Sequence, residues 1–224
     1  MKDLFFKLIP KYAVIPLFSC VILNFLVYYG NRLIPKSRYF DVSIPFIDGH
    51  IPLWTWMIVF YVLFYAFWVV GFVIIGRESR ELCYHLLSGE LIAKLICLVF
   101  FLVLPTKMVD WPSGQFEINN VFDWTTQMIY NADEPNNLFP SIHCLESWVV
   151  LRGAWRCKKP PKWYPILCTF LAIAIFASTV FVRQHVVVDI LGGILVAELG
   201  FWLAAKFRAW RIFPVLERKL FKTV

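Results

Sequence analysis

The sequence predicts an all-α integral membrane protein, a bundle of six transmembrane helices forming a single domain over residues 1–224. Hydrophobic residues make up 60% of the chain and charged residues only 17%, whereas soluble domains are about half apolar and about a quarter charged. The apolar residues also gather in runs that approach the roughly 20 residues needed to cross a bilayer. No linker, repeat or low-complexity tract divides the chain.

We expect the six spans to lie near residues 12–30, 53–75, 86–105, 140–155, 163–182 and 186–206. The fourth is the weakest of the six, because it is short and contains Glu146. The first follows Lys2, Lys7 and Lys11 and has no small-residue cleavage site behind it. We therefore interpret it as a retained span rather than a signal peptide.

The distribution of Lys and Arg predicts that both termini are cytoplasmic, since these residues concentrate on that side of membrane proteins. With the N-terminus inside, 16 of the 22 basic residues fall inside and five outside, while Lys94 lies within a span. The connections at 31–52, 105–139 and 183–185 then face outward. The net charge of +7 fits this membrane pattern, so we expect no nucleic-acid partner.

The outer connection at 105–139 is unusually long for a loop without a function. Within it, apolar residues are spaced for one face of a short amphipathic helix: Val121, Phe122, Trp124, Met128 and Ile129. We expect this helix to serve as a lid, or as a platform at the lipid surface.

The first candidate site is the segment Phe139-Pro140-Ser141-Ile142-His143. Proline is well tolerated at a helix start, because its missing N–H would be unpaired there anyway. Ser141 would then lie among the free backbone N–H groups of the first turn, which attract phosphate. The alternative is an ordinary helix start with no ligand.

The second candidate site is the segment from His185 to Asp189. Spacing of four residues puts both side chains on one face of a helix. A carboxylate on one ring nitrogen orients the imidazole and favours its positive form. Ionisable groups within a span are functional by default, although a structural ion pair remains the alternative.

Both segments resemble motifs of the type 2 phosphatidic acid phosphatase superfamily. The first resembles its Pro-Ser-Gly-His or Pro-Ser-Leu-His motif. The second, Ser178-Thr179, five residues, His185, three residues and Asp189, resembles its final motif, Ser-Arg-x5-His-x3-Asp. Motif order, separation, outer placement and the six-helix plan all fit.

Two further segments look like the branch that includes inositol phosphorylceramide and sphingomyelin synthase-like proteins. They are Asp133-x-Pro135-Asn136 and Asp41-x3-Pro45-Phe46. This resemblance brings a phosphotransferase into consideration beside a phosphatase.

The resemblance to the superfamily implies a mechanism. His185 attacks phosphorus and becomes a phosphohistidine, while Asp189 orients it. His143 protonates the leaving alkoxide and then helps to activate the acceptor. Ser141 and neighbouring amides hold phosphate oxygens. The family needs no metal or other cofactor, so the expected partners are a lipid phosphate substrate and membrane lipids.

This sequence departs from the family at its arginines. If Pro112 is the proline of the first family motif, Lys-x6-Arg-Pro, then Trp111 replaces the arginine and Leu104 the lysine. Thr179 replaces the arginine of the final motif. These departures leave open whether water or an alcohol accepts the phosphoryl group.

During its transfer a phosphoryl group needs cations or hydrogen-bond donors at its oxygens. The nearest cations along the chain are Lys107 and Arg183. Arg183 precedes His185 by two residues and can bind phosphate with two hydrogen bonds, whereas Lys107 is equally an ordinary interfacial lysine. The motif resemblance adds Ser178 to the phosphate-binding candidates.

Other polar residues in the spans have less certain roles. Glu90 and Lys94 are four residues apart and form a candidate pair. Glu146 follows His143 by three residues and is a candidate for the same cavity, or for a buried carboxylate directed toward the cytoplasm. His143, Glu146, His185 and Asp189 are also residue types that bind metals. No C-x-x-C pair points to zinc or to a disulfide framework.

Taken together, the sequence predicts a membrane phosphatase that hydrolyses a lipid phosphate of the phosphatidic acid or isoprenyl phosphate type. The first alternative is a lipid headgroup phosphotransferase. A membrane transporter is an alternative of another class, since polar residues in spans often mark ion paths. A lipid-binding member of the fold without chemistry is a further one. The oligomeric state stays open.

Overall fold

The computed structural model describes residues 6–30, 39–108, 117–133 and 136–221. Within these ranges the chain is all-α, apart from two isolated bridges between single residues. Positions of the predicted motifs and charge pattern that lie outside these ranges are Lys2, Arg32, Lys36, Arg38, Trp111, Pro112, Pro135 and Lys222.

Five helical segments of the described chain are long and apolar enough to cross a membrane, judged by length and composition. They confirm five of the six predicted spans as helices of spanning length. These are α2 (Lys11–Phe25) with the π-helical turn η1 (Leu26–Gly30), the 3-10 turn η2 (Thr55–Met57) with α4 (Ile58–Glu78), α5 (Arg80–Val103), α8 (Tyr164–Phe181) and α9 (Val187–Lys206).

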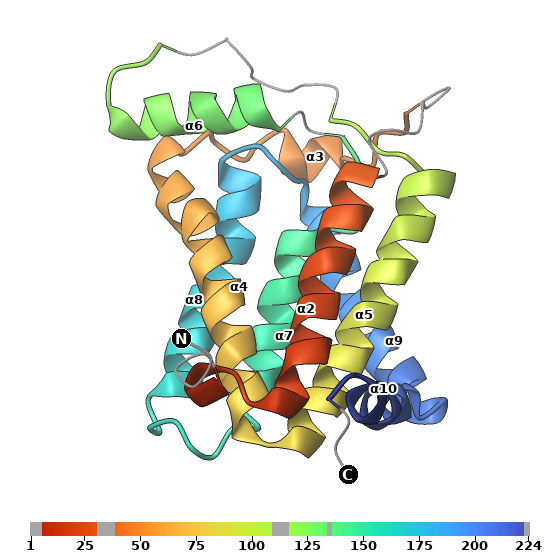
Figure 1. Ribbon diagram of the computed structural model, residues 1–224. Coiled ribbons are helices and arrows are strands. Elements are labelled where there is room, and N and C mark those ends of the chain that lie inside the picture. Colours follow the sequence, from red (N-terminus) through yellow and green to blue (C-terminus); the bar gives the residue numbers. More distant parts are fainter. Residues whose placement is uncertain (1–5, 31–38, 109–116, 134–135, 222–224) are drawn as a thin grey trace.

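The fourth predicted span, 140–155, corresponds to the shorter helix α7 (Ile142–Ala154, 13 residues). At 1.5 Å per residue it is about 20 Å long, against about 30 Å for the hydrocarbon core. It packs against α4, α5, α8 and α9 in the middle of the bundle (Figure 1). Helix α7 begins at Ile142 rather than at position 140, because Ser141 is the N-cap and its hydroxyl accepts the Cys144 N–H at 3.4 Å.

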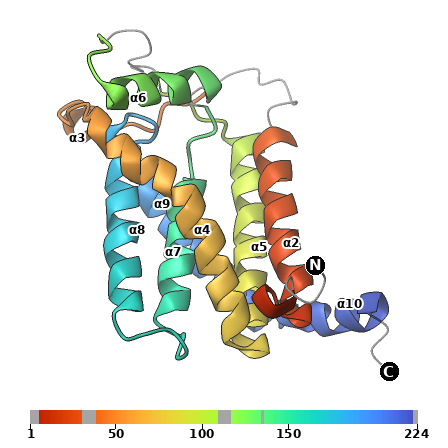
Figure 2. The same cartoon turned by 60° about the vertical axis from the view of Figure 1, so that its left-hand side comes forward.

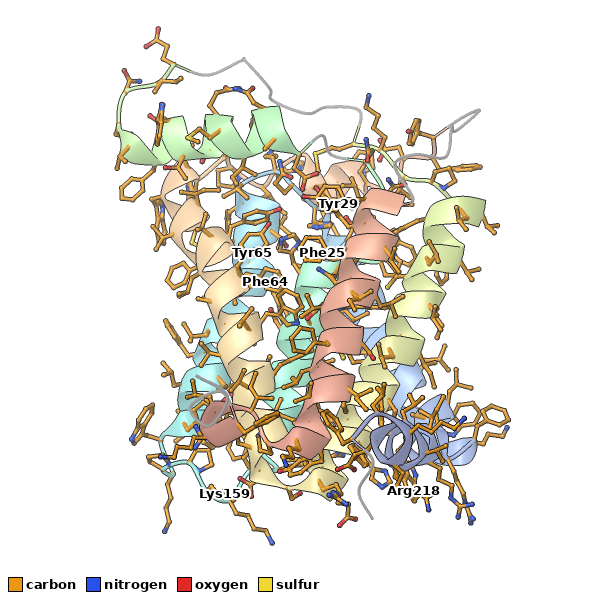
Figure 3. All side chains as sticks on the ribbon, viewed as in Figure 1. Phe25, Tyr29, Phe64, Tyr65, Lys159 and Arg218 are labelled. Atoms are coloured by element: carbon orange, nitrogen blue, oxygen red, sulfur yellow. The ribbon has the colours of Figure 1, made fainter. Side chains whose placement is uncertain are left out.

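Short helices cover the two ends of the bundle. At one end lie α3 (Pro45–Asp48) and α6 (Val121–Ala132), and at the other α10 (Ile212–Phe221), preceded by the 3-10 turn η3 (Ala209–Arg211) (Figure 2). Lys159 and Arg218 lie at the α10 end, away from Tyr29 and Tyr65 (Figure 3). These two basic side chains and these two tyrosines therefore lie at different levels along the axis of the bundle.

Helix α6 is the amphipathic helix that the sequence predicts. Its apolar side chains Val121, Trp124 and Met128 are exposed, whereas Asp123 and Thr126 are buried against the bundle. The apolar face therefore points away from the protein, the arrangement expected of a helix lying at a lipid surface.

We predict that Asp123 docks α6 in a pH-dependent manner. Hydrogen bonds from the Thr55 hydroxyl (2.6 Å) and the Asn119 N–H (3.0 Å) lower the pKa of its carboxyl below the ordinary value. This stabilisation is therefore complete above the ordinary pKa of about 3.9 and is lost as the pH falls through the lowered pKa. At pH 7, Asp123→Asn should speed hydrogen exchange of the α6 amides about tenfold.

The matched control for this measurement is Gln127→Ala, a change on the same helix at an exposed hydrogen bond to Asn131. It should leave α6 exchange unchanged. Equal exchange in wild type and Asp123→Asn would show that Thr55 does not hold α6 in place.

A charged cluster is buried in the bundle below the α6 end. The Lys94 ammonium lies 2.5 Å from Glu90 and 2.6 Å from Glu146, and it donates to the Cys20 carbonyl at 3.0 Å. The predicted Glu90–Lys94 pair is therefore confirmed. Of the two placements left open for Glu146, the structure has the buried carboxylate: Lys94 holds it, and Glu146 is not among the residues that line the cavity of His143. Two carboxylates thus share one ammonium, and the cluster joins α2, α5 and α7.

Candidate active site

A tight turn between α8 and α9 positions His185. The backbone N–H groups of Gln184 and His185 both donate to the Thr179 carbonyl at 3.0 Å. Arg183, which lies between the end of α8 and Gln184, adopts a left-handed conformation with φ of 54°. The turn reverses the chain and leaves His185 two residues before the start of α9.

His185 is paired with Asp189 across one turn, as its spacing predicts. Its Nδ1 lies 3.1 Å from Oδ2 of Asp189, which also accepts the Val186 N–H at 3.0 Å. Asp189 is fully buried and His185 is 8% exposed. The carboxylate occupies Nδ1, and the other ring nitrogen, Nε2, lies 3.1 Å from Oγ of Ser141.

Close contact between α7 and α9 brings the two predicted motifs together. The Ser141 N–H donates to the Asp189 carbonyl at 3.2 Å. On the facing side of α9, a Cβ added at Gly193 would lie 2.6 Å from the Ser141 carbonyl oxygen and 3.0 Å from the Leu145 nitrogen. Only glycine permits this approach, so Gly193 sets the distance between the motifs.

We predict that Gly193→Val lowers kcat about 100-fold while the helix content stays unchanged. The added side chain meets backbone atoms, so α7 and α9 must separate, and a misplacement of about 1 Å at a reacting group has an effect of this size. Circular dichroism and turnover in detergent measure the two quantities. Gly30→Ala is the control, since a Cβ there has no atom within 4 Å. Unchanged kcat in Gly193→Val would contradict this role.

His143 lies on the first turn of α7 and faces His185. The centroids of the two rings are 5.7 Å apart. Tyr61 and Phe64 of α4 enclose the His143 ring at centroid distances of 4.7 and 4.4 Å. Its Nε2 is buried and has no hydrogen-bond partner among the described residues. A histidine of this kind is available for a proton exchange with a bound ligand.

Both histidines line a cavity of about 280 Å³. Most of its remaining wall is apolar or aromatic, and α2, η1 and α4 contribute Phe25, Tyr28, Tyr29, Phe64, Tyr65 and Trp68. Four of these are labelled in Figure 3, where the α2–η1 pair faces the α4 pair. Phe25, Tyr29 and Tyr65 are about half exposed on the flank of the bundle. The wall of the cavity is therefore partly exposed on this flank.

A smaller cavity of about 100 Å³ lies on the other side of His185, and its polar lining residues are Asp41, Ser43, Asp48, Arg183 and His185. Asp48 accepts the Val187 N–H at 2.9 Å, at the start of α9. The Arg183 guanidinium donates to the Ile51 carbonyl at 2.6 Å. Arg183 therefore lies beside His185, but in the cavity that His143 does not line.

Ser141 touches His185 but lines neither cavity, and the remaining two predicted phosphate-binding residues line neither cavity as well. Ser178 is fully buried, and its hydroxyl donates to the Ile175 carbonyl of its own helix at 2.7 Å. Lys107 is exposed, and its backbone N–H donates to the Phe40 carbonyl at 2.9 Å. Ser178 is thus held by its own helix, and Lys107 by the backbone of its loop, away from the two histidines.

The sequence analysis missed Thr106, which anchors the segment leading to Ser141. Its hydroxyl oxygen accepts the N–H groups of Leu138 (2.8 Å) and Phe139 (2.9 Å), and its carbonyl accepts that of Asn137 (2.7 Å). Nothing in the local sequence pattern indicates this contact, because the partners lie more than 30 positions apart.

The four candidate metal ligands of the sequence do not converge. Glu146 is held by Lys94. Across the described residues no group of three or more His, Cys, Asp or Glu side chains is placed to hold a metal ion.

Comparison with known proteins agrees with the motif resemblance. Neither the curated proteins nor the solved structures yielded a match. Residues 104–213 match the family model of the PAP2 superfamily, which identifies no branch within it. The matched stretch contains Ser141, His143, His185 and Asp189, all of which line or adjoin one cavity. The chain therefore belongs to the PAP2 superfamily, the type 2 phosphatidic acid phosphatases and their relatives.

Proposed function

We propose that this protein is a membrane phosphatase that cleaves a lipid phosphate ester through a phosphohistidine on His185. One observation carries the proposal: Asp189 holds Nδ1, and Nε2 faces Ser141 beside a cavity that His143 also lines. A carboxylate on Nδ1 fixes the tautomer in which Nε2 is an unprotonated nucleophile.

The reaction balances with these groups alone. Nε2 of His185 forms a bond to phosphorus as the bond from phosphorus to the lipid oxygen breaks. His143 gives that oxygen its proton. Water then attacks phosphorus, returns a proton to His143 and breaks the nitrogen–phosphorus bond. The first-turn N–H groups of α7, which have no acceptor within the helix, are donors for phosphate oxygens together with Ser141.

We place this site at the outer membrane surface. The described basic residues Lys159 and Arg218 lie at the opposite end (Figure 3), and basic residues favour the cytoplasmic side. In this orientation α7 is the sixth membrane helix, both chain ends are cytoplasmic, and α6 lies on the outer leaflet. A substrate in that leaflet reaches the cavity from the flank between α2 and α4.

Transfer of the phosphoryl group to an alcohol is the second candidate function. It is favoured by the wall of the cavity, where the described side chains are mostly apolar and aromatic. Such a wall excludes water and accommodates a second lipid as the acceptor.

Turnover by the purified protein in detergent tests both candidates. Phosphatidic acid, an isoprenyl diphosphate, and phosphatidylinositol with ceramide would be offered in the presence of EDTA, and free phosphate and lipid products followed together. Free phosphate identifies a phosphatase, whereas a new headgroup-bearing lipid without free phosphate identifies a transferase. Detergent abolishes any gradient, so turnover also separates an enzyme from a transporter. A folded protein inactive on all three would contradict the proposal.

A further inference from the structure

Helix α10 lies across the end of the bundle opposite α6 and reaches beyond it to one side (Figure 2). It follows α9 after the 3-10 turn η3, so only a short connection separates the two helices. The chain turns at Arg208, which adopts a left-handed conformation with φ of 53°. Helix α10 therefore starts close to the point where α9 leaves the bundle.

The end of α9 carries side chains typical of a membrane–water interface. Trp202 and Phe207 are 55% and 69% exposed, and the Lys206 ammonium lies 4.5 and 5.7 Å from the centroids of their rings. Exposed tryptophans beside basic residues mark the level where the hydrocarbon core meets the lipid headgroups. Because η3 and α10 follow directly, they lie near the same level.

One side of α10 is packed against the bundle. Its buried residues are Phe213 and Glu217, which lie one turn apart. Glu217 accepts the Tyr84 hydroxyl at 2.7 Å and an Arg80 N–H at 3.2 Å. The rings of Phe213 and Tyr84 have centroids 5.2 Å apart. These contacts with α5 hold α10 in one rotation about its own axis.

A second side of α10 is an apolar stripe formed by Ile212, Leu216 and Leu220. Their spacing of four residues puts them on one side of the helix. The ends of the stripe are open, since Ile212 is 57% exposed and Leu220 68%. An amphipathic helix at the level of the headgroups buries such a stripe between the upper parts of the acyl chains.

Basic residues dominate the polar part of this segment. Five of the six charged residues between positions 206 and 221 are basic: Lys206, Arg208, Arg211, Arg218 and Lys219. The sixth, Glu217, already accepts from Arg80 of α5. All five basic side chains are exposed. Each basic residue near a membrane surface strengthens binding to anionic lipids roughly fivefold.

We propose that α10 lies in the headgroup layer of the membrane and binds anionic phospholipids there. The apolar stripe enters the upper hydrocarbon layer, while Arg211, Arg218 and Lys219 contact lipid phosphates. Arginine suits this partner, because its guanidinium can make two hydrogen bonds to one phosphate. In the orientation proposed above these lipids belong to the cytoplasmic leaflet, whose surface is negative. The binding itself does not depend on the catalytic site.

Hydrogen exchange of the full-length protein in lipid nanodiscs tests the proposal. One set of nanodiscs contains phosphatidylcholine alone, and the other an equal mixture of phosphatidylcholine and phosphatidylglycerol. The α10 amides of the wild type should exchange at least about tenfold more slowly in the mixture. Equal exchange in the two lipids would overturn the proposal and leave the basic surface to an acidic protein partner.

A triple variant tests which residues carry the effect. Combining Arg211→Gln, Arg218→Gln and Lys219→Gln should abolish the difference between the two lipids. The matched control removes three exposed basic residues from the connection between α7 and α8, by Arg156→Gln, Lys158→Gln and Lys162→Gln. It lowers the net charge equally and should keep the difference. Loss of the difference in the control as well would mean a bulk effect of charge and overturn the assignment to α10.

The apolar stripe is tested by Leu220→Ser. This variant should speed exchange of the α10 amides in both lipid compositions, because it weakens insertion into the hydrocarbon layer. Val215→Ser, a change at an exposed position outside the stripe, is its control. Unchanged exchange in Leu220→Ser would overturn the placement of the stripe in the membrane.

Discussion

Replacing His185 with asparagine should lower kcat by at least about 10⁴-fold, because it removes the atom that forms the covalent bond to phosphorus. Asparagine keeps a polar group beside Asp189 and Ser141, so the turn before α9 should persist. Product release in detergent measures the loss. Rapid quenching in alkaline detergent with phosphate-labelled substrate should trap a phosphoprotein that is stable in alkali and labile in acid in the wild type, and none in the variant.

His50→Asn is the matched control for His185→Asn. His50 is exposed in the connection after α3, and its Nδ1 contacts only the Phe46 carbonyl at 2.9 Å among the hydrogen bonds of the described residues. Its replacement should leave kcat unchanged. Full activity in His185→Asn would exclude covalent catalysis by this residue, whatever the product.

Replacing His143 with glutamine should have the second-largest effect, a loss of about 10²- to 10⁴-fold in kcat on a lipid substrate. An alkoxide is a poor leaving group without a proton, and His143 is the histidine that faces His185 across the cavity. A p-nitrophenyl ester should largely escape this loss, since p-nitrophenolate leaves without protonation. Measuring kcat for both leaving groups therefore isolates the proton transfer.

The comparison of leaving groups also distinguishes a loss of proton transfer from a change in the packing of the cavity. His143 packs against Tyr61 and Phe64, so its removal changes the shape of the cavity. Equal losses on the lipid and the p-nitrophenyl ester would mean that the ring acts through packing, and the general-acid role would be wrong.

The fold could be predicted from the sequence where long apolar runs make spanning helices. The interval 140–155 shows the limit of this pattern. Its helix covers 13 residues and is enclosed by four other helices, and an apolar run does not distinguish a buried short helix from a full span. Amphipathic α6 could be predicted because its periodicity is local, whereas the direction of its apolar face could not.

In the candidate site, too, the local contacts could be predicted from the sequence and the long-range contacts could not. His185 and Asp189 lie on one turn, so their pairing follows from helix periodicity alone. Ser141 meets His185 across 44 positions, a contact that depends on the approach of α7 at Gly193. The position of Tyr61 beside His143 escaped notice because only tertiary packing brings α4 against the first turn of α7.

The cluster of Glu90, Lys94 and Glu146 has a consequence for how the chain enters the bilayer. Glu90 and Lys94 lie one turn apart on α5, so this helix carries its own neutralising pair into lipid. Glu146 has its counterion on α5 and none within the short α7. Because α5 precedes α7 along the chain, the ammonium is already in the membrane when α7 emerges from the ribosome. We expect α7 to insert into the membrane by pairing with α5, because the order of synthesis supplies Lys94 before Glu146 needs it.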